Sequence, residues 1–235
     1  MPGDATTTCW SCGTMRAVHF CSACGKVQPP VPVDYFTFFG LPRKLNIDVS
    51  RLEHEFYDLS RKLHPDLYAR ANAQEQEWSE EQSSQLNDAY RTLKDPIKRT
   101  QYLLRLEGVE LEEQSKTATD RARETGEVKK QVVPPDLLEQ VFELNMQLEE
   151  LRMNKNSGED DPALTKELES RKAEFEEKLA ELFEGLKGCW NEWDRLLDSG
   201  SDADRLRVQD KMVDSLNRRN YIRNLVRDVN EALGN

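Results

Sequence analysis

Two apolar stripes at helical spacing, separated by a proline, constrain the fold of this chain more than any other feature of its sequence. The first stripe comprises Leu52, Phe56, Leu59 and Leu63, and the second comprises Leu86, Ala89, Tyr90 and Leu93. Apolar residues that recur every three or four positions form one face of an amphipathic helix. Pro65 disfavours the helical region for His64 and has no amide hydrogen, so the first helix should end there. The stripes therefore predict an all-α helical hairpin, with the tripeptide His64-Pro65-Asp66 exposed on the bend.

Polar residues beside the stripes predict where the two helices begin. Asp48 is a suitable N-cap for the first helix, because its carboxylate can accept a free amide of the first turn. The segment from Ser79 to Gln82 fits a capping box at the start of the second helix. The connecting loop would then hold about a dozen residues, which is long for a helical hairpin. Four aromatic residues are expected to fill the core rather than to bind a ligand: Phe36, Phe39, Trp78 and Tyr102.

Three more amphipathic segments follow residue 133 and predict an antiparallel three-helix bundle. The first begins at Pro134-Pro135, since proline is tolerated in the first turn of a helix, and Asp161-Pro162 opens the second. The second helix can continue past Trp193, and the segment from Ser199 to Asp202 ends it and caps the third helix. The expected core comprises Leu137, Val141, Leu144, Leu148 and Leu151 of the first helix, Leu164, Leu168, Phe175, Leu179, Leu182 and Leu186 of the second, and Met212, Leu216, Ile222, Leu225, Val229 and Leu233 of the third.

The first bundle helix carries a second apolar set, Leu138, Phe142 and Met146, on a different flank from Leu137. At about 100° per residue, these side chains lie roughly 100–180° around the helix from Leu137. One neighbouring helix cannot bury both flanks. The second set is therefore either covered by a further helix or exposed as a patch for a partner, and the pattern alone leaves both alternatives open.

Four cysteines near the start of the chain have the spacing of a metal site. They are Cys9, Cys12, Cys21 and Cys24, in a C-x2-C-x8-C-x2-C pattern. Two close pairs of thiolates can surround one ion tetrahedrally, and a closed shell of four predicts structural zinc in a module spanning residues 1–32. A glycine after each pair allows a positive φ, which can aim backbone amides at the sulfur atoms. The ligand type also suits iron, two disulfides are the alternative to a metal, and His19 is interpreted as a loop residue.

The charge and hydropathy of the chain argue against nucleic-acid and membrane binding. Residues 1–108 contain 13 Lys and Arg against 14 Asp and Glu, so residues 109–235 carry −10 of the total charge of −11. Such a surface should repel nucleic-acid phosphates. No run approaches the roughly 18 consecutive apolar residues of a membrane span. The first residues lack a charged-then-apolar targeting pattern, so the sequence predicts a cytoplasmic protein.

The motifs of the hairpin closely resemble a J-domain, the module by which co-chaperones activate heat-shock-70-type chaperones. The resemblance is carried by DYFTFFGL at 34–41, HPD at 64–66, NDAYRTL at 87–93, DPIKR at 95–99 and YLL at 102–104. This wording resembles the HscB family of iron–sulfur cluster assembly. Some members of that family carry an N-terminal zinc module, and its members have a three-helix bundle after the J-domain. The resemblance implies a zinc module (1–32), a J-domain (33–108), a linker (109–133) that is polar and flexible, and a bundle (134–235).

For the J-domain, the resemblance implies a binding surface rather than an active site. His64, Pro65 and Asp66 would contact the nucleotide-binding domain of an HscA-like heat-shock-70-type chaperone, and Arg61 and Lys62 would steer docking onto its acidic surface. ATP hydrolysis would take place in the partner. A catalytic dyad of His64 and Asp66 is not expected, because it would need a pocket and a third orienting group. Leu67 stands where many J-domains have lysine, which weakens the local positive charge.

For the bundle, the resemblance implies binding of the iron–sulfur scaffold IscU through an apolar patch on the first helix and an aromatic residue on the last. The matching residues are Leu138, Phe142 and Tyr221, with Met146 and Glu143 as weaker candidates. Tyr221 is expected at the edge of the apolar face, within reach of solvent. Glu139 stands where relatives tend to be apolar, which makes the patch smaller. The implied function is delivery of the scaffold to the chaperone, and the alternative is a general J-protein that holds unfolded clients.

Overall fold

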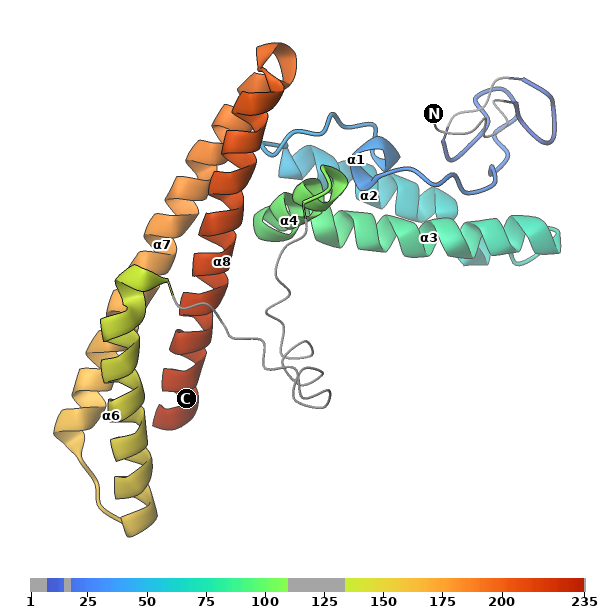
Figure 1. Ribbon diagram of the computed structural model, residues 1–235. Helices are drawn as coiled ribbons and strands as arrows, with labels where there is room; N and C mark the ends of the chain where they lie inside the picture. Colours follow the sequence, from blue (N-terminus) through green and yellow to red (C-terminus); the bar gives the residue numbers. More distant parts are fainter. Residues whose placement is uncertain (1–7, 15–17, 110–133, 235) are drawn as a thin grey trace, which may run out of the picture. The chain divides into compact units, whose positions relative to one another are not determined.

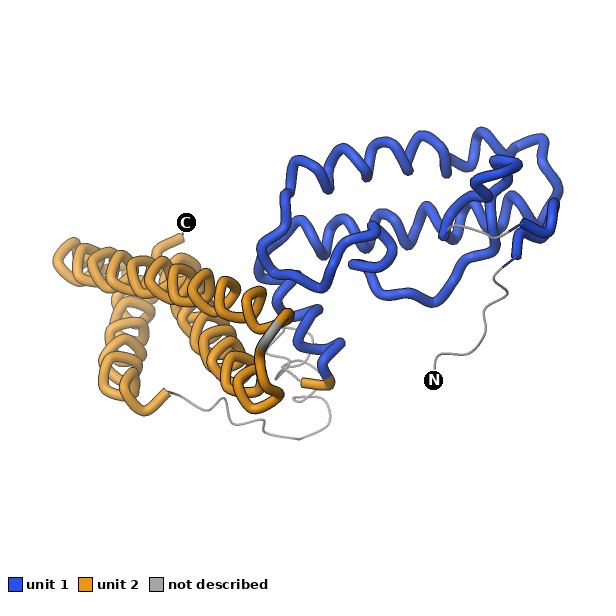
Figure 2. Tube along the Cα trace, turned by 90° about the horizontal axis from the view of Figure 1, so that it is seen from above, with its two compact units in different colours: residues 1–107 blue, residues 108–235 orange. Residues whose placement is uncertain are grey.

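The chain is helical, as the sequence predicts, and divides into two compact units. The computed structural model describes residues 8–14, 18–109 and 134–234; the units are residues 1–107 and 108–235 (Figure 2). Within the described ranges there is no strand, and an antiparallel bridge joins Phe20 to Val27. The predicted linker lies, apart from residue 109, outside the described residues, and the predicted boundary at residue 32 stays a prediction. None of the described helices has the length and apolar composition of a membrane span.

The first unit is built around a pair of packed helices, α2 (Val49–Leu63) and α3 (Ala73–Lys94) (Figure 1). A 3-10 turn, η1 (Pro65–Tyr68), lies between them. The short helix α1 (Tyr35–Phe38) contacts α3, and α4 (Pro96–Leu106) follows α3 directly. The predicted helical hairpin is therefore confirmed, and the tripeptide lies where its two helices are joined.

Both predicted ends of α2 are confirmed. Asp48 Oδ1 accepts the backbone amide of Arg51 at 3.0 Å, and the helix ends at Leu63, immediately before His64. The facing stripes form a buried cluster, which the partly buried Phe39, Phe56, Leu59 and Trp78 extend. The fully buried members of this cluster are Val27, Phe38, Leu63, Leu86 and Ala89.

The predicted start of the second helix is wrong. α3 begins at Ala73 and is capped by Asn72, whose Oδ1 accepts the Glu75 amide at 2.9 Å and whose Nδ2 donates to Glu75 Oε2 at 2.8 Å. Ser79 and Gln82, the expected capping pair, are buried inside α3. Their side chains bond to backbone carbonyls of other segments, so residues with the local pattern of a cap serve tertiary contacts instead. The connection shortens accordingly to residues 64–72.

The second unit is the expected three-helix bundle. A 3-10 turn, η2 (Pro135–Leu137), leads into α6 (Leu138–Ser157), which is followed by α7 (Pro162–Ser199) and α8 (Asp202–Leu233). The caps at the two turns are the predicted ones: Asp161 Oδ1 accepts two amides of the first turn of α7 at 3.0 Å, and Ser201 caps α8. Short polar turns therefore reverse the chain twice.

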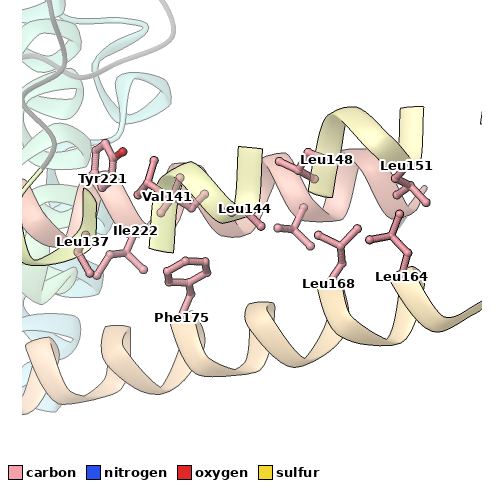
Figure 3. Packing of buried hydrophobic residues seen from close by; sticks show 12 residues of the cluster. Leu137, Val141, Leu144, Leu148, Leu151, Leu164, Leu168, Phe175, Tyr221 and Ile222 are labelled. Atoms are coloured by element: carbon pink, nitrogen blue, oxygen red, sulfur yellow. The ribbon is translucent and has the colours of Figure 1, made fainter. Parts of the chain in front are cut away.

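The bundle core closely matches the apolar stripes read from the sequence. Figure 3 shows the side chains of α6 pointing between α7 and α8. The buried cluster comprises Leu137, Val141, Leu144, Leu148, Leu151, Leu164, Leu168, Phe175, Tyr221, Ile222, Leu225 and Val229. Burial of each such leucine or phenylalanine side chain stabilises the fold by roughly 1.5–3 kcal/mol. This packing fixes which flank of α6 faces inward and which faces solvent.

Candidate functional site

The HPD turn (residues 64–66) lies exposed at the end of α2. The side chain of Asp66 is 91% exposed and that of His64 is 56% exposed. The backbone amide of Asp66 donates to His64 Nδ1 at 3.3 Å, so the imidazole caps the first turn of η1. Tyr68 Oη donates to the carbonyl of Lys62 at 3.1 Å, which ties η1 back to the end of α2. The predicted open bend is thus confirmed.

The charged residues beside the HPD turn include a carboxylate. Arg61 and Lys62 are both exposed in the last turn of α2, as expected. The guanidinium of Arg61 pairs with Asp58, and this hydrogen bond holds the pKa of Asp58 below its usual value. Asp58 therefore offsets part of the positive charge of this face. Leu67 follows the turn as an exposed apolar side chain.

The four cysteines converge on one point in the first unit. Their Sγ atoms all lie within 4.8 Å of one another. Two of the pairs, Cys9 with Cys24 and Cys12 with Cys21, are 3.6 Å and 3.5 Å apart. A tetrahedral ion with metal–sulfur distances of about 2.3 Å requires sulfur atoms about 3.8 Å apart, so the four residues fit a metal ion. A disulfide requires about 2.05 Å, and since the cysteines are free, the disulfide alternative is wrong.

The backbone around the cysteines forms two similar turns. Gly13 and Gly25 have φ of 73° and 71°, which confirms the predicted positive φ. Their amides, however, donate to the carbonyls of Cys9 and Cys21 at 3.0 Å and 2.9 Å rather than to sulfur. Amides that are directed at sulfur include those of the residue two after the first cysteine of each pair. These two are Ser11 N, 3.3 Å from Cys9 Sγ, and Ala23 N, 3.4 Å from Cys21 Sγ.

Hydrogen bonding separates the acidities of the cysteine thiols. The Thr14 hydroxyl, 3.3 Å from Cys21 Sγ, and backbone amides lower the pKa of Cys21 to about 6. The amide of Lys26 lowers the pKa of Cys24, but burial and the neighbouring sulfur atoms outweigh it and raise that pKa to about 11. Because metal ions bind the thiolate, ion binding at this site releases protons.

His19 lies in a loop, as interpreted from the sequence, and outside the sulfur cluster. Its Nδ1 is 2.9 Å from Gln82 Oε1 of α3, and its Nε2 is 2.9 Å from the carbonyl of Phe38. The imidazole also packs on the Phe38 ring, with centroids 4.3 Å apart. Sequence reasoning missed these contacts, because no local pattern identifies partners 19 and 63 residues away.

The second apolar flank of α6 is exposed. Leu138, Phe142 and Met146, which we call the α6 patch, are 54%, 67% and 60% exposed, respectively. Among the described residues no helix covers them, so the exposed alternative holds. Met153 extends the apolar surface toward the end of α6.

Two further residues expected at this surface are engaged elsewhere. The prediction that Tyr221 reaches solvent is wrong: it is 5% exposed and belongs to the buried cluster with Leu137 and Ile222 (Figure 3). Burial raises the pKa of its hydroxyl. The carboxylate of Glu143 accepts a hydrogen bond from Arg171 of α7 at 2.7 Å.

Residues 34–102 match the family model of the DnaJ domain. The chain is 31% identical to the human iron–sulfur cluster co-chaperone protein HscB over 192 residues, which cover 77% of this chain and 72% of the human protein. It is 40% identical to the mouse protein of that name over 45% of this chain, and 41% identical to an HscB homologue of Arabidopsis thaliana over 48%. The chain spans about half the length of these two relatives, 47% and 44%.

Two solved structures share the fold. The crystal structure of human co-chaperone protein HscB aligns with a TM-score of 0.56 and 24% identity, over 93% of this chain and 96% of that one. Chaperone HscB from Vibrio cholerae aligns with a TM-score of 0.51 and 24% identity, over 85% and 96%. At this identity the likeness concerns the fold alone. The relatives are named as co-chaperones rather than as enzymes.

Proposed function

This chain belongs to the HscB family of J-domain co-chaperones, and from this membership we propose that it delivers the iron–sulfur scaffold IscU to an HscA-like heat-shock-70-type chaperone. The HPD turn stimulates the ATPase of that chaperone, and the bundle holds the scaffold. The observation that carries the proposal is the exposed HPD turn at the junction of α2 and η1, within a matched DnaJ domain. The chain itself supplies no catalytic residue.

His64, Pro65 and Asp66 make the contact that triggers hydrolysis in the partner, and Arg61 and Lys62 steer the encounter. The test is single-turnover ATP hydrolysis by the chaperone with the full chain and with His64→Gln. His64→Gln should lose the stimulation, whereas Arg70→Gln, an exposed cation on the same connection, should retain it. Equal stimulation by His64→Gln and the unaltered chain contradicts this role.

The α6 patch binds the scaffold through its three exposed apolar side chains. This proposal draws support from their exposure on a helix whose other flank is buried in the bundle core. Calorimetry with Leu138, Phe142 and Met146 all changed to alanine should show loss of scaffold binding. Leu206→Ala, which removes a similarly exposed leucine from α8, serves as the matched control. Tyr221 is tested only as Tyr221→Phe, because truncation to alanine would damage the core.

A competition experiment separates this function from that of a general J-protein. An unrelated unfolded peptide in excess should leave scaffold binding unchanged. Displacement of the scaffold by that peptide would favour a broad client range instead. The cytoplasmic location expected from the sequence stays a prediction.

We also propose that the tetracysteine site holds structural zinc. Bound zinc would link the two cysteine turns and contribute folding free energy, with no position left open for catalysis. One zinc per chain by elemental analysis, after purification without added metal, is the expected result. Stoichiometric iron instead would overturn the assignment of the metal but not of its ligands.

A further inference from the structure

The first three turns of α3 contact both the tetracysteine region and the end of α2 that leads into the HPD turn. Both sets of contacts lie within the first unit of the chain. The residues that face the tetracysteine region are Glu75, Trp78 and Gln82. Those that reach the end of α2 are Ser79 and Ser83. The same three turns of α3 therefore contact both regions.

The first contact is an ion pair at the start of α3. Lys26 Nζ lies 2.9 Å from Glu75 Oε1, and the side chain of Glu75 is 5% exposed. Glu75 also forms the reciprocal cap with Asn72, so its carboxylate lies where the connection 64–72 meets the first turn of α3. Lys26 follows Cys24-Gly25, and its carbonyl accepts the amide of Cys21 at 2.9 Å. The second cysteine turn thus places the counter-charge of a buried carboxylate.

The second contact is aromatic. Trp10, which follows Cys9, packs edge-on against Trp78 of α3 with ring centroids 5.7 Å apart. Its Nε1 donates to the carbonyl of Val27 at 2.7 Å, so the ring is held from both cysteine turns. Val27 itself is buried in the cluster beneath α2 and α3.

The third contact is a chain of hydrogen bonds that ends on a metal ligand. Gln82 Oε1 faces His19 Nδ1 at 2.9 Å, and Gln82 Nε2 donates to the carbonyl of Gln28 at 2.6 Å. The side-chain amide of Gln28 in turn lies 3.4 Å from Cys9 Sγ. Gln82 and Gln28 are buried, so water cannot readily replace the groups to which their side chains are hydrogen-bonded.

The same stretch of α3 also holds the residue that precedes the HPD turn. The hydroxyls of Ser79 and Ser83 both donate to the carbonyl of Leu63, at 2.6 Å and 2.8 Å. This carbonyl is one of those left without a helical partner at the end of α2. Two hydroxyls from α3 therefore hold the peptide group that joins Leu63 to His64.

We propose that Lys26, Gln28 and His19 are positioning residues for the HPD turn, and that zinc bound at the four cysteines keeps them in place. Loss of the ion frees the cysteine turns, removes Lys26 from Glu75 and loosens the start of α3 and the connection 64–72. Small metal modules have little core of their own, so their folding depends on the ion. This inference rests on the proposed function, because it holds that zinc binding at the cysteines controls the order of the HPD turn that contacts the chaperone.

The test measures amide hydrogen exchange in the full chain, zinc-loaded and after removal of zinc with a chelator and a thiol reductant. Removal should accelerate exchange in residues 64–78 at least tenfold and leave α4 unchanged. Lys26→Met, with its zinc content verified, should show the same change in weaker form, and Lys26→Arg should restore protection because it keeps the ion pair. Lys98→Met removes an exposed lysine of α4 and should behave as the unaltered chain.

A chaperone titration provides the second readout. Lys26→Met should raise the concentration for half-maximal ATPase stimulation about threefold and leave the maximal stimulation unchanged, since only the ordered fraction of the turn binds. Unchanged exchange in residues 64–78 after zinc removal, or in Lys26→Met, would overturn the inference. Failure of the zinc-loaded chain to stimulate any ATPase would instead overturn the proposed function, while the exchange comparison alone decides the positioning role.

Discussion

Phe142 and Leu144 lie two positions apart on α6, and their truncation to alanine should have opposite consequences. Leu144 is fully buried in the bundle, whereas Phe142 is 67% exposed. Leucine-to-alanine changes at such buried sites cost about 3 kcal/mol, part of which reflects the cavity left behind. We therefore expect Leu144→Ala to lower the melting temperature by about 10 °C. Phe142→Ala should cost no more than about 0.5 kcal/mol of stability.

For scaffold binding the order is reversed: Phe142→Ala should have the larger effect and Leu144→Ala the smaller one. A phenylalanine side chain has about 200 Å² of surface that can be buried. Since about two thirds of this surface is exposed in Phe142, a partner can cover about 130 Å² of it. At roughly 25 cal/mol per Å² this sets an upper limit of about 3 kcal/mol. Ordering of the interface consumes part of it, so about 2 kcal/mol, or a 30-fold rise in Kd, is the expected loss. Leu144→Ala should leave Kd within about threefold at a temperature where the bundle is folded.

Calorimetry for Kd and circular dichroism for melting measure both quantities on the same preparations. Parallel loss of stability and affinity in Phe142→Ala would refute the reasoning, because it would mean that this side chain supports the fold. An unchanged Kd with unchanged stability would place the scaffold elsewhere on the bundle.

Three further outcomes follow from local geometry. Arg218 donates two hydrogen bonds of 2.9 Å and 2.8 Å to Asp136 and lowers the pKa of that carboxyl. The pair therefore contributes stability above about pH 4 that is lost as the pH falls through the lowered pKa. Thermal melting should show that Asp136→Asn destabilises the chain more at pH 7 than at pH 2. Asn72→Ala removes the side chain that caps α3 at the Glu75 amide. It should lower the free energy of unfolding by about 1 kcal/mol and accelerate amide hydrogen exchange in the first turn of α3. Gly25 has φ of 71°, and a Cβ added there would meet no other atom within 4 Å. Gly25→Ala should therefore weaken zinc binding only through backbone strain, by about fivefold. Competition with a chelator measures this affinity.

Local signals in the sequence were sufficient wherever one residue determines a dihedral angle or a nearby hydrogen bond. Pro65 ended α2, and Asp48 and Asp161 capped the helices that follow them. The cysteine spacing identified the four residues that converge, and the helical period separated the buried flank of α6 from the exposed one. Periodicity and capping act over a few residues, so the chain itself carries this information.

Only the tertiary structure decided which polar side chains meet across the sequence. Ser79 looks like the cap of a helix, yet its hydroxyl donates to the carbonyl of Leu63, and the cap of α3 is Asn72, about two turns earlier. Tyr221 looks like an edge residue, yet it is buried in the bundle core. Lys26 and Glu75 lie 49 residues apart and still form the pair that joins the cysteine turn to the helix. Such partners are selected by burial in a common core, where a polar group must find whichever donor or acceptor the packing brings within reach.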